Sequence, residues 1–165
     1  MPGSKRPDPE GEAEEWFFYC LHQVLRRRDA AFAAPLAELG LDLARWRALS
    51  TVRRIHGCTM SELADFTMVD RTTLTRTVDQ LAAGGLIERL ASPGDRRRVC
   101  LALTEEGAAT FDQALVAMRR FNAVALGDVV EAELLAMRTL AGKVLANITG
   151  SPERARAILE FTRQP

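Results

Sequence analysis

The sequence constrains the fold most where two short helix signals stand only a few residues apart. The TMSE motif at 59–62 fits a capping box, in which the first and last side chains each accept a hydrogen bond from the other residue's backbone amide. Asp70 is a favoured residue for capping a second helix. The pattern predicts a helix over about 60–66, a short apolar turn and a second helix over 71–83. Two helices joined in this way form a helix-turn-helix.

A β-hairpin is expected directly after the second helix. The pair Gly84-Gly85 stops that helix, and the strand-like runs LIERLA (86–91) and VCLALT (99–104) follow. The second run alternates apolar and other residues, as a strand with one buried face does. The segment SPGDRRR between the runs is short enough to be the loop of a hairpin. The whole unit is therefore predicted to be a winged helix-turn-helix.

Longer helical patterns with apolar stripes flank this unit on both sides. Pro35 predicts a kink or an end near the close of the first of them. The fold class predicted is mainly α with a small β-hairpin wing. The flanking helices are expected over 14–38, 41–55, 105–125, 129–148 and 153–162.

The pattern divides the chain into three kinds of segment. Residues 1–13 are mostly acidic and lack an apolar stretch, so we expect a disordered N-terminal lead. Residues 41–104 are expected to form the winged helix-turn-helix domain. Residues 14–40 and 105–165 form a helical region at both ends of the chain, whose apolar stripes need a cover.

Charge is distributed unevenly, although the formal net charge is zero. Residues 45–98 carry ten arginines against six acidic side chains, whereas residues 1–44 and 99–165 are both net acidic. Local charge, more than total charge, sets the attraction to a phosphate backbone. The basic segment coincides with the helix-turn-helix and the hairpin, which favours a nucleic acid as the partner.

The helix over 71–83 has an exposed face of a distinctive kind. A helical wheel of about 100° per residue turns Leu74, Val78 and Leu81 toward the core. The opposite side carries short hydroxyls and arginine, which bind phosphates and base edges in the major groove. The residues expected to contact DNA from this helix are Arg71, Thr72, Thr73, Thr75 and Arg76.

The hairpin tip adds a second cationic element one hairpin beyond that helix. Arg96, Arg97 and Arg98 would reach a neighbouring groove or the DNA backbone. Asp95 could pair with Arg97 and hold it in one rotamer, which lowers the ordering cost of binding. We therefore add Asp95 and these three arginines to the predicted DNA-binding residues.

Residues 61–107 resemble the winged helix-turn-helix core of the MarR family of bacterial transcription regulators. The resemblance rests on TTLTRTVDQL (72–81), GLIER (85–89), DRR (95–97) and LTEEG (103–107). It implies a homodimer in which the N- and C-terminal helices of two chains interlock, so that 14–40 and 105–165 become the dimerisation region. It also implies a palindromic operator of double-stranded DNA as the partner.

The resemblance further implies a cytoplasmic repressor of a nearby operon that a small ligand, often aromatic, releases from DNA. Members of the family bind such effectors between the dimerisation helices and the winged domain. The candidate pocket residues in this sequence are Trp16, Tyr19, His22, Trp46 and Arg53.

Two alternatives remain open. One branch of the family senses oxidants with a cysteine on the first helix, where Cys20 lies in this chain. That branch uses tyrosines to hydrogen-bond the cysteine, whereas the only tyrosine here, Tyr19, is adjacent and points about 100° away. The other alternative is a winged-helix module that binds a protein instead of DNA.

Several functional classes lack a signal in the sequence. Cys20, Cys58 and Cys100 show no pairing or metal-ligand spacing, which indicates reduced cytoplasmic thiols and no metal site. No catalytic or nucleotide-binding motif is present, so we expect neither an enzyme nor a cofactor. No apolar run has the roughly 20 residues of a membrane span, and we expect no membrane partner.

Overall fold

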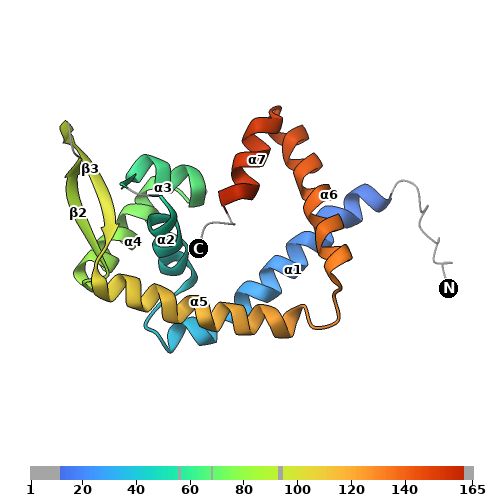
Figure 1. Ribbon diagram of the computed structural model, residues 1–165, viewed down its shortest axis with the longest axis horizontal. Coiled ribbons are helices and arrows are strands. Elements are labelled where there is room, and N and C mark those ends of the chain that lie inside the picture. The colour runs from blue at the N-terminus through green and yellow to red at the C-terminus, as the bar shows by residue number, and fades with distance from the viewer. Residues whose placement is uncertain (1–11, 56, 68, 93–94, 162–165) are drawn as a thin grey trace, which may run out of the picture.

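The structure is a computed structural model that describes residues 12–55, 57–67, 69–92 and 95–161. Its description of side chains leaves out residues 12–15 and 92–98. The chain is mainly helical, with a small antiparallel sheet, which confirms the predicted fold class (Figure 1). In chain order the elements are α1 (Glu12–Ala37), α2 (Leu43–Arg54), β1 (Cys58–Thr59), α3 (Met60–Thr67), α4 (Arg71–Ala83), β2 (Ile87–Ser92), β3 (Asp95–Leu103), α5 (Glu105–Ala125), α6 (Glu131–Thr149) and α7 (Pro152–Phe161).

The capping residues predicted for the helix-turn-helix form their hydrogen bonds. Thr59 Oγ1 accepts from the Glu62 amide at 3.3 Å, and a Glu62 carboxylate oxygen accepts from the Thr59 amide at 2.8 Å. Asp70 accepts from the Thr73 amide at 2.9 Å and begins α4. These local bonds set where α3 and α4 begin, and hence the length of the turn between them.

The first two helices differ from their predicted bounds by a few residues. Helix α1 begins at Glu12 and continues through Pro35 before it ends. The remainder of the predicted lead, residues 1–11, lies outside the described residues. Helix α2 begins at Leu43 and not at the predicted residue 41, because Asp42 caps it by accepting from the Arg45 amide at 2.8 Å.

The sheet contains a strand that the sequence did not predict. Its order is β1-β3-β2, and Cys58 of β1 lies opposite Leu101 of β3. The two residues of β1 are too few to show an alternating pattern. Strand β3 begins at Asp95, so the backbone of residues 96–98 belongs to the strand and not to the predicted loop.

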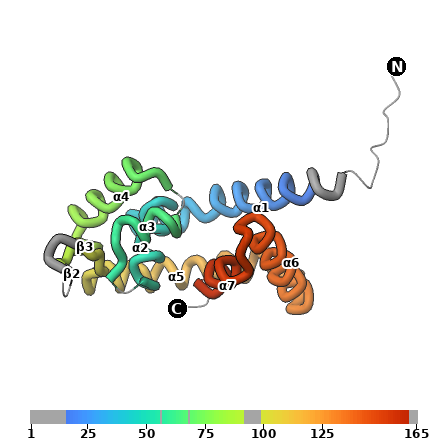
Figure 2. Tube along the Cα trace, turned by 90° about the horizontal axis from the view of Figure 1, so that it is seen from above, coloured from blue at the N-terminus to red at the C-terminus, as the bar shows by residue number. Residues whose placement is uncertain are grey.

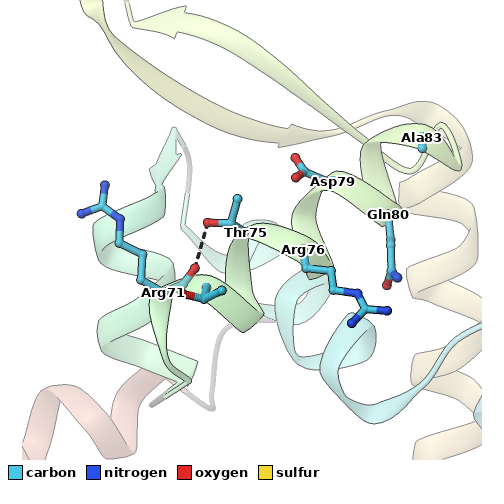
Figure 3. A pocket seen from close by; sticks show the side chains of 7 residues that line it. Arg71, Thr75, Arg76, Asp79, Gln80 and Ala83 are labelled. Atoms are coloured by element: carbon cyan, nitrogen blue, oxygen red, sulfur yellow. Dashed lines mark hydrogen bonds between the residues drawn. The ribbon is translucent and has the colours of Figure 1, made fainter.

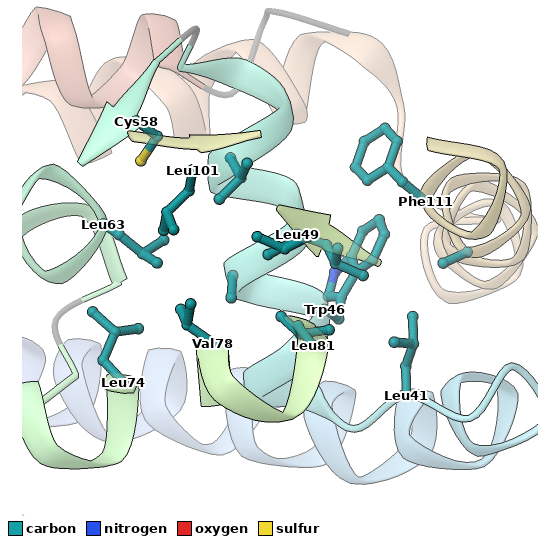
Figure 4. Packing of buried hydrophobic residues seen from close by; sticks show 14 of the residues in the cluster. Leu41, Trp46, Leu49, Cys58, Leu63, Leu74, Val78, Leu81, Leu101 and Phe111 are labelled. Carbon is teal, nitrogen blue, oxygen red and sulfur yellow. The ribbon is translucent and has the colours of Figure 1, made fainter. Parts of the chain in front are cut away.

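The core lies between α2, α4, α5 and the sheet (Figure 4). Trp46 of α2 stacks on Phe111 of α5, with ring centroids 5.3 Å apart, and Phe32 of α1 meets Trp46 edge-on at 6.2 Å. The core therefore joins α1 and α5 to the helix-turn-helix. Leu74, Val78 and Leu81 are buried, as the sequence predicted, and they pack in the same core as Trp46, Leu49 and Val52 of α2.

Helix α6 and the N-terminal half of α1 lie at the end of the molecule farthest from the hairpin (Figures 1 and 2). Helix α6 has no buried residue in the single chain. Burial of apolar surface is the main driving force for association, so the two helices offer a face that remains to be covered. Large apolar side chains exposed there include Trp16, Phe18, Tyr19, Val24, Leu25, Leu134, Leu135, Met137, Leu140 and Ile148.

Candidate nucleic-acid interface

Helix α4 presents an open hollow of about 700 Å³ on its exposed side (Figure 3). Leu74, Val78 and Leu81 on its other side are buried, which fixes the rotation of the helix about its axis. The hollow is therefore built almost wholly from polar residues of one helix. Its lining residues are Arg71, Thr72, Thr75, Arg76, Asp79, Gln80 and Ala83.

The structure brings four of the five predicted α4 residues together in this hollow. Thr73 is exposed but lies outside it, next to the cap of the helix. Thr75 donates its hydroxyl proton to the Arg71 carbonyl at 2.8 Å, so its oxygen is left as an acceptor (Figure 3). Within the described part of the chain, the Thr72 hydroxyl forms no hydrogen bond, and it can donate to a phosphate.

The two arginines of the hollow are available to an external partner. Among the described residues, neither the Arg71 nor the Arg76 side chain has an ion pair or hydrogen bond, and both are exposed. A free guanidinium can bind a phosphate or the O6 and N7 atoms of guanine through two parallel bonds. The N-terminal part of α4, where Arg71 lies, also carries the positive end of the helix dipole, which attracts anions.

Hydrogen bonding keeps the cap of α4 charged. The bond with the Thr73 hydroxyl, followed by the bond from the Thr73 backbone, lowers the pKa of Asp70 from its ordinary value. An ionised cap accepts from the first turn of the helix more strongly than a protonated one. Asp70 therefore holds the first turn of α4 in place, where Arg71 and Thr72 are displayed.

Two contacts that sequence reasoning missed hold α4 to its neighbours. Arg89 of β2 donates to the Asp79 carboxylate at 2.5 Å, which links the hairpin to the helix. Arg45 of α2 donates to Gln80 Oε1 at 3.2 Å, which leaves the Gln80 amide nitrogen free to face outward. The sequence contains the residues of both pairs, but it does not tell which of the many arginines meets which acceptor.

The wing residues predicted to bind DNA are only partly described. The backbone of Asp95, Arg96, Arg97 and Arg98 runs in β3, and the hairpin extends past α4 (Figure 1). The side chains of these four residues lie outside the described part, so the predicted pair of Asp95 with Arg97 stays a prediction.

If the exposed side of α4 binds DNA, replacing Arg89 with alanine should weaken that binding by about two- to tenfold, or roughly 0.5–1.5 kcal/mol. The change leaves the Asp79 carboxylate unpaired on the exposed side of α4, where it would repel phosphates, and it releases the hairpin from the helix. Fluorescence anisotropy with a labelled DNA duplex measures the loss. The double variant Arg89→Ala/Asp79→Asn removes the repulsion and should recover part of the affinity; no recovery would contradict the electrostatic explanation.

A second cavity, of about 320 Å³, lies between α2, α3, α5 and α7. Aromatic rings and arginine side chains both line it. Ser50 is buried, and its Oγ forms no hydrogen bond within the described residues. Burial lowers the pKa of Arg54, but an arginine still stays charged near neutral pH. The lining residues are Trp46, Arg47, Ser50, Thr51, Arg54, Phe66, Thr67, Met118 and Phe161.

Only one of the predicted effector residues reaches this cavity in the single chain. Trp46 lines it, whereas Trp16, Tyr19 and His22 are exposed near the start of α1. Arg53 lies over the Phe111 ring, with its guanidinium carbon 5.9 Å from the ring centroid, and lines a separate hollow beside β3. The single chain therefore does not bring these five residues together.

The cysteines differ in their surroundings. Burial, with smaller contributions from Glu62 and Cys100, raises the pKa of Cys58 to about 12, so this residue stays a thiol near neutral pH. Cys58 lies directly opposite Leu101 in the sheet, and Cys100 precedes Leu101 in β3. Because successive residues of a strand point to opposite faces, Cys58 and Cys100 lie on opposite faces of the sheet and are not placed for a disulfide. Cys20 on α1 is partly exposed.

A metal site and a membrane span both lack a candidate among the described residues. These residues contain no group of three or more histidine, cysteine or carboxylate side chains that could hold a metal ion. No helix among them is both long enough and apolar enough to span a membrane. What they do contain is a helix-turn-helix followed by a wing, with arginine and hydroxyl groups on the exposed face of the second helix. These features define the winged-helix class of DNA-binding proteins.

Comparison with known proteins identifies the family. The model of the MarR family matches residues 39–98. The transcriptional repressor NicR of Pseudomonas putida is 28% identical over 127 residues, which cover 77% of this chain and 80% of NicR. The multiple antibiotic resistance protein MarR of Escherichia coli is 34% identical over 93 residues, which cover 56% of this chain and 65% of MarR.

Solved structures agree with these matches over more of the chain. The reduced form of E. coli MarR superposes with a TM-score of 0.67 at 30% identity, covering 77% of this chain and 94% of that one. A mutant of E. coli MarR complexed with operator DNA gives a TM-score of 0.72 at 27% identity, covering 81% and 96%. The chain belongs to the MarR family of transcriptional regulators, which are not enzymes, and the resemblance found in its sequence is confirmed.

Proposed function

We propose that this regulator is a homodimeric repressor that binds a palindromic operator and is released from it by a small ligand. The observation that carries the proposal is the hollow on α4, where Arg71, Arg76 and Thr72 are exposed without partners among the described residues. The wing arginines Arg96, Arg97 and Arg98, with Asp95, would contact an adjacent groove or the phosphate backbone. Such a repressor acts in the cytoplasm, where its operator lies.

Dimerisation is proposed from the uncovered faces of α1 and α6. Their exposed apolar side chains lie at the end of the molecule opposite the hairpin, so a second copy could cover them without blocking α4 (Figure 1). We assign 14–40 and 105–165 to the dimerisation region and 41–104 to the winged domain. Two winged domains related by a two-fold axis read two half-sites about one helical turn apart.

The second cavity supports an effector that combines a flat ring with a negative charge. Trp46, Phe66 and Phe161 offer apolar ring surface, and the buried Ser50 hydroxyl offers a hydrogen bond. Positive charge comes from Arg54 and from Arg47, which is paired with Asp29 at 2.6 Å and would exchange that partner for an anionic ligand. The cavity lies beside α3, the first helix of the helix-turn-helix. A ligand that binds better to one arrangement of the winged domains shifts the population toward it, and this arrangement need not match the spacing of the operator.

The Arg76→Ala variant tests the assignment of the α4 face. It should bind the operator more weakly by about 1–3 kcal/mol, or roughly 5- to 150-fold, because a bidentate contact to guanine is lost. Titrations should also show relaxed discrimination at the base pair that Arg76 reads. Arg154→Ala, which removes the same charge from an exposed site on α7, serves as the control. Equal affinities for wild type and Arg76→Ala would refute the groove assignment.

The alternatives predict different results in the same assays. A winged-helix module that binds a protein would show no steep salt dependence with DNA, because no counterions are released. An oxidation sensor would lose its DNA on treatment with peroxide, and the Cys20→Ser variant would not. The partly exposed position of Cys20 is what keeps this second alternative open.

A further inference from the structure

The last described helix, α7, packs closely against α6, the helix before it. Ala155 on the inner side of α7 is buried. At Gly142 of α6, an added Cβ would lie 3.3 Å from a methyl carbon of Leu159, so the two helices approach each other closely. The position of α7 therefore follows that of α6.

The final described residue of α7 leaves this helix pair and contacts the helix-turn-helix. The ring of Phe161 stacks on that of Phe66 in α3, with centroids 4.2 Å apart and planes inclined by 20°. The guanidinium of Arg54, at the end of α2, lies 5.6 Å from the Phe161 centroid. In Figure 1 this end of α7 lies close to α2, whereas α6 lies farther from the winged domain.

The contact is a bridge and not part of a continuous core. The 320 Å³ cavity lies beside it and shares Phe66, Arg54 and Phe161 as lining residues. Phe66 keeps 42% of its surface exposed even with the stack in place. Among the described residues, the Phe161 ring makes the contacts with Phe66 and Arg54, so the loss of that ring would remove both of them.

A movement of Phe66 would be transmitted to the DNA-facing helix. Phe66 belongs to α3, and the Thr67 hydroxyl closes that helix by donating to the Leu63 carbonyl at 2.7 Å. The turn to α4 is short, and Asp70 begins α4 directly after it. Because α3 and α4 are joined so tightly, a tilt of α3 changes the position of Arg71 and Arg76.

We propose that Phe161 is a positioning residue that sets the orientation of the helix-turn-helix relative to the terminal helices. Through this orientation it determines which half-site spacing the dimer accepts. The proposal rests on the proposed function as a dimeric operator-binding protein. Phe161 itself lies on α7, away from the α4 face, and acts through Phe66.

The test uses a series of operators whose half-sites are moved apart or together one base pair at a time. Wild type should prefer one spacing. In Phe161→Ala the advantage of that spacing over its neighbours should fall by about two- to tenfold, the size expected when one aromatic pair is lost. Phe161→Trp keeps an aromatic ring and should keep the preference. Ile158→Ala shortens an apolar side chain on the same helix and should behave as wild type.

The possible outcomes distinguish a failure of this proposal from a failure of the proposed function. Should Phe161→Ala lose affinity by one common factor at every spacing, Phe161 would only stabilise the fold, and the proposal would be overturned. A variant with the wild-type spacing profile would overturn it as well. A wild type without any spacing preference would instead refute the dimeric reading of an operator on which the proposal rests. Hydrogen exchange of residues 60–67, faster in Phe161→Ala than in Ile158→Ala, is the expected independent sign that the bridge holds α3.

Discussion

Alanine in place of Gly107 is expected to unfold the winged domain or to leave it only marginally stable. Gly107 lies in the first turn of α5, where that helix packs on the chain between α4 and β2. An added Cβ would lie 1.9 Å from the Leu86 carbonyl oxygen and 2.8 Å from its carbon. Both are backbone atoms and cannot rotate away as a flexible side chain could, so the start of α5 or the entry to β2 must move.

That movement would break other contacts at the same junction. Leu86 O accepts from the Thr104 amide at 3.2 Å, and Thr104 donates its hydroxyl to the Gly85 carbonyl at 2.5 Å while it caps α5. We expect the free energy of unfolding to fall by about 4 kcal/mol or more, a loss seen only when a specific packing feature is destroyed. Such a loss is a large part of the roughly 5–15 kcal/mol that stabilises a typical domain.

Urea unfolding followed by circular dichroism measures the loss. The control is Gly127→Ala, where an added Cβ meets only the Val124 and Ala123 carbonyl oxygens at 3.5 and 3.7 Å, which is ordinary contact. If Gly107→Ala unfolds at the same urea concentration as Gly127→Ala, the packing of α5 against Leu86 is less tight than described here.

Glutamate in place of Leu135 is expected to abolish the dimer and, with it, tight operator binding. Leu135 is on α6, where 56% of its surface is exposed in the single chain and the neighbouring apolar side chains are uncovered. If a second copy covers this face, an ionised carboxylate there must be desolvated without a partner, which costs several kcal/mol. Since two linked half-sites bind far more tightly than one, we expect the operator affinity to fall by about 100-fold or more.

Light scattering coupled to gel filtration, together with operator titration, checks both parts of this prediction. The variant should elute as a monomer, whereas wild type should elute as a dimer. Gln113→Glu adds a carboxylate at an exposed site on α5 and should remain a dimer with wild-type affinity. If Leu135→Glu is still a dimer, the interface lies elsewhere and the assignment of α6 is wrong.

The parts of the fold that the sequence predicted well depend on interactions between residues that are close together in the sequence. The caps at Thr59 and Asp70 are bonds between residues three apart, and both helices begin where their caps were predicted. The rotation of α4 was also predictable, because the period of Leu74 and Val78 determines which side faces the core. The composition of the exposed side, which we propose contacts DNA, followed from that rotation.

The parts that could not be predicted depend on where distant segments meet. Strand β1 exists because Cys58 and Thr59 meet β3, about forty residues later, and nothing in two residues signals a strand. The bond of Arg89 to Asp79 and the stack of Phe161 on Phe66 are likewise results of packing. Periodicity gives the face on which a side chain lies but not its partner, which is also why the predicted effector residues do not meet in one chain.

The most direct test of the central claim is selection of binding sites from random duplex DNA, followed by titration of the selected site against salt. The account predicts a palindrome with half-sites about one helical turn apart and an affinity that falls steeply as salt rises, because each neutralised phosphate releases counterions. The slope should become shallower in Arg71→Ala or Arg76→Ala if that arginine contacts a phosphate. No enriched site, or binding indifferent to salt, would contradict the claim that the α4 face reads DNA.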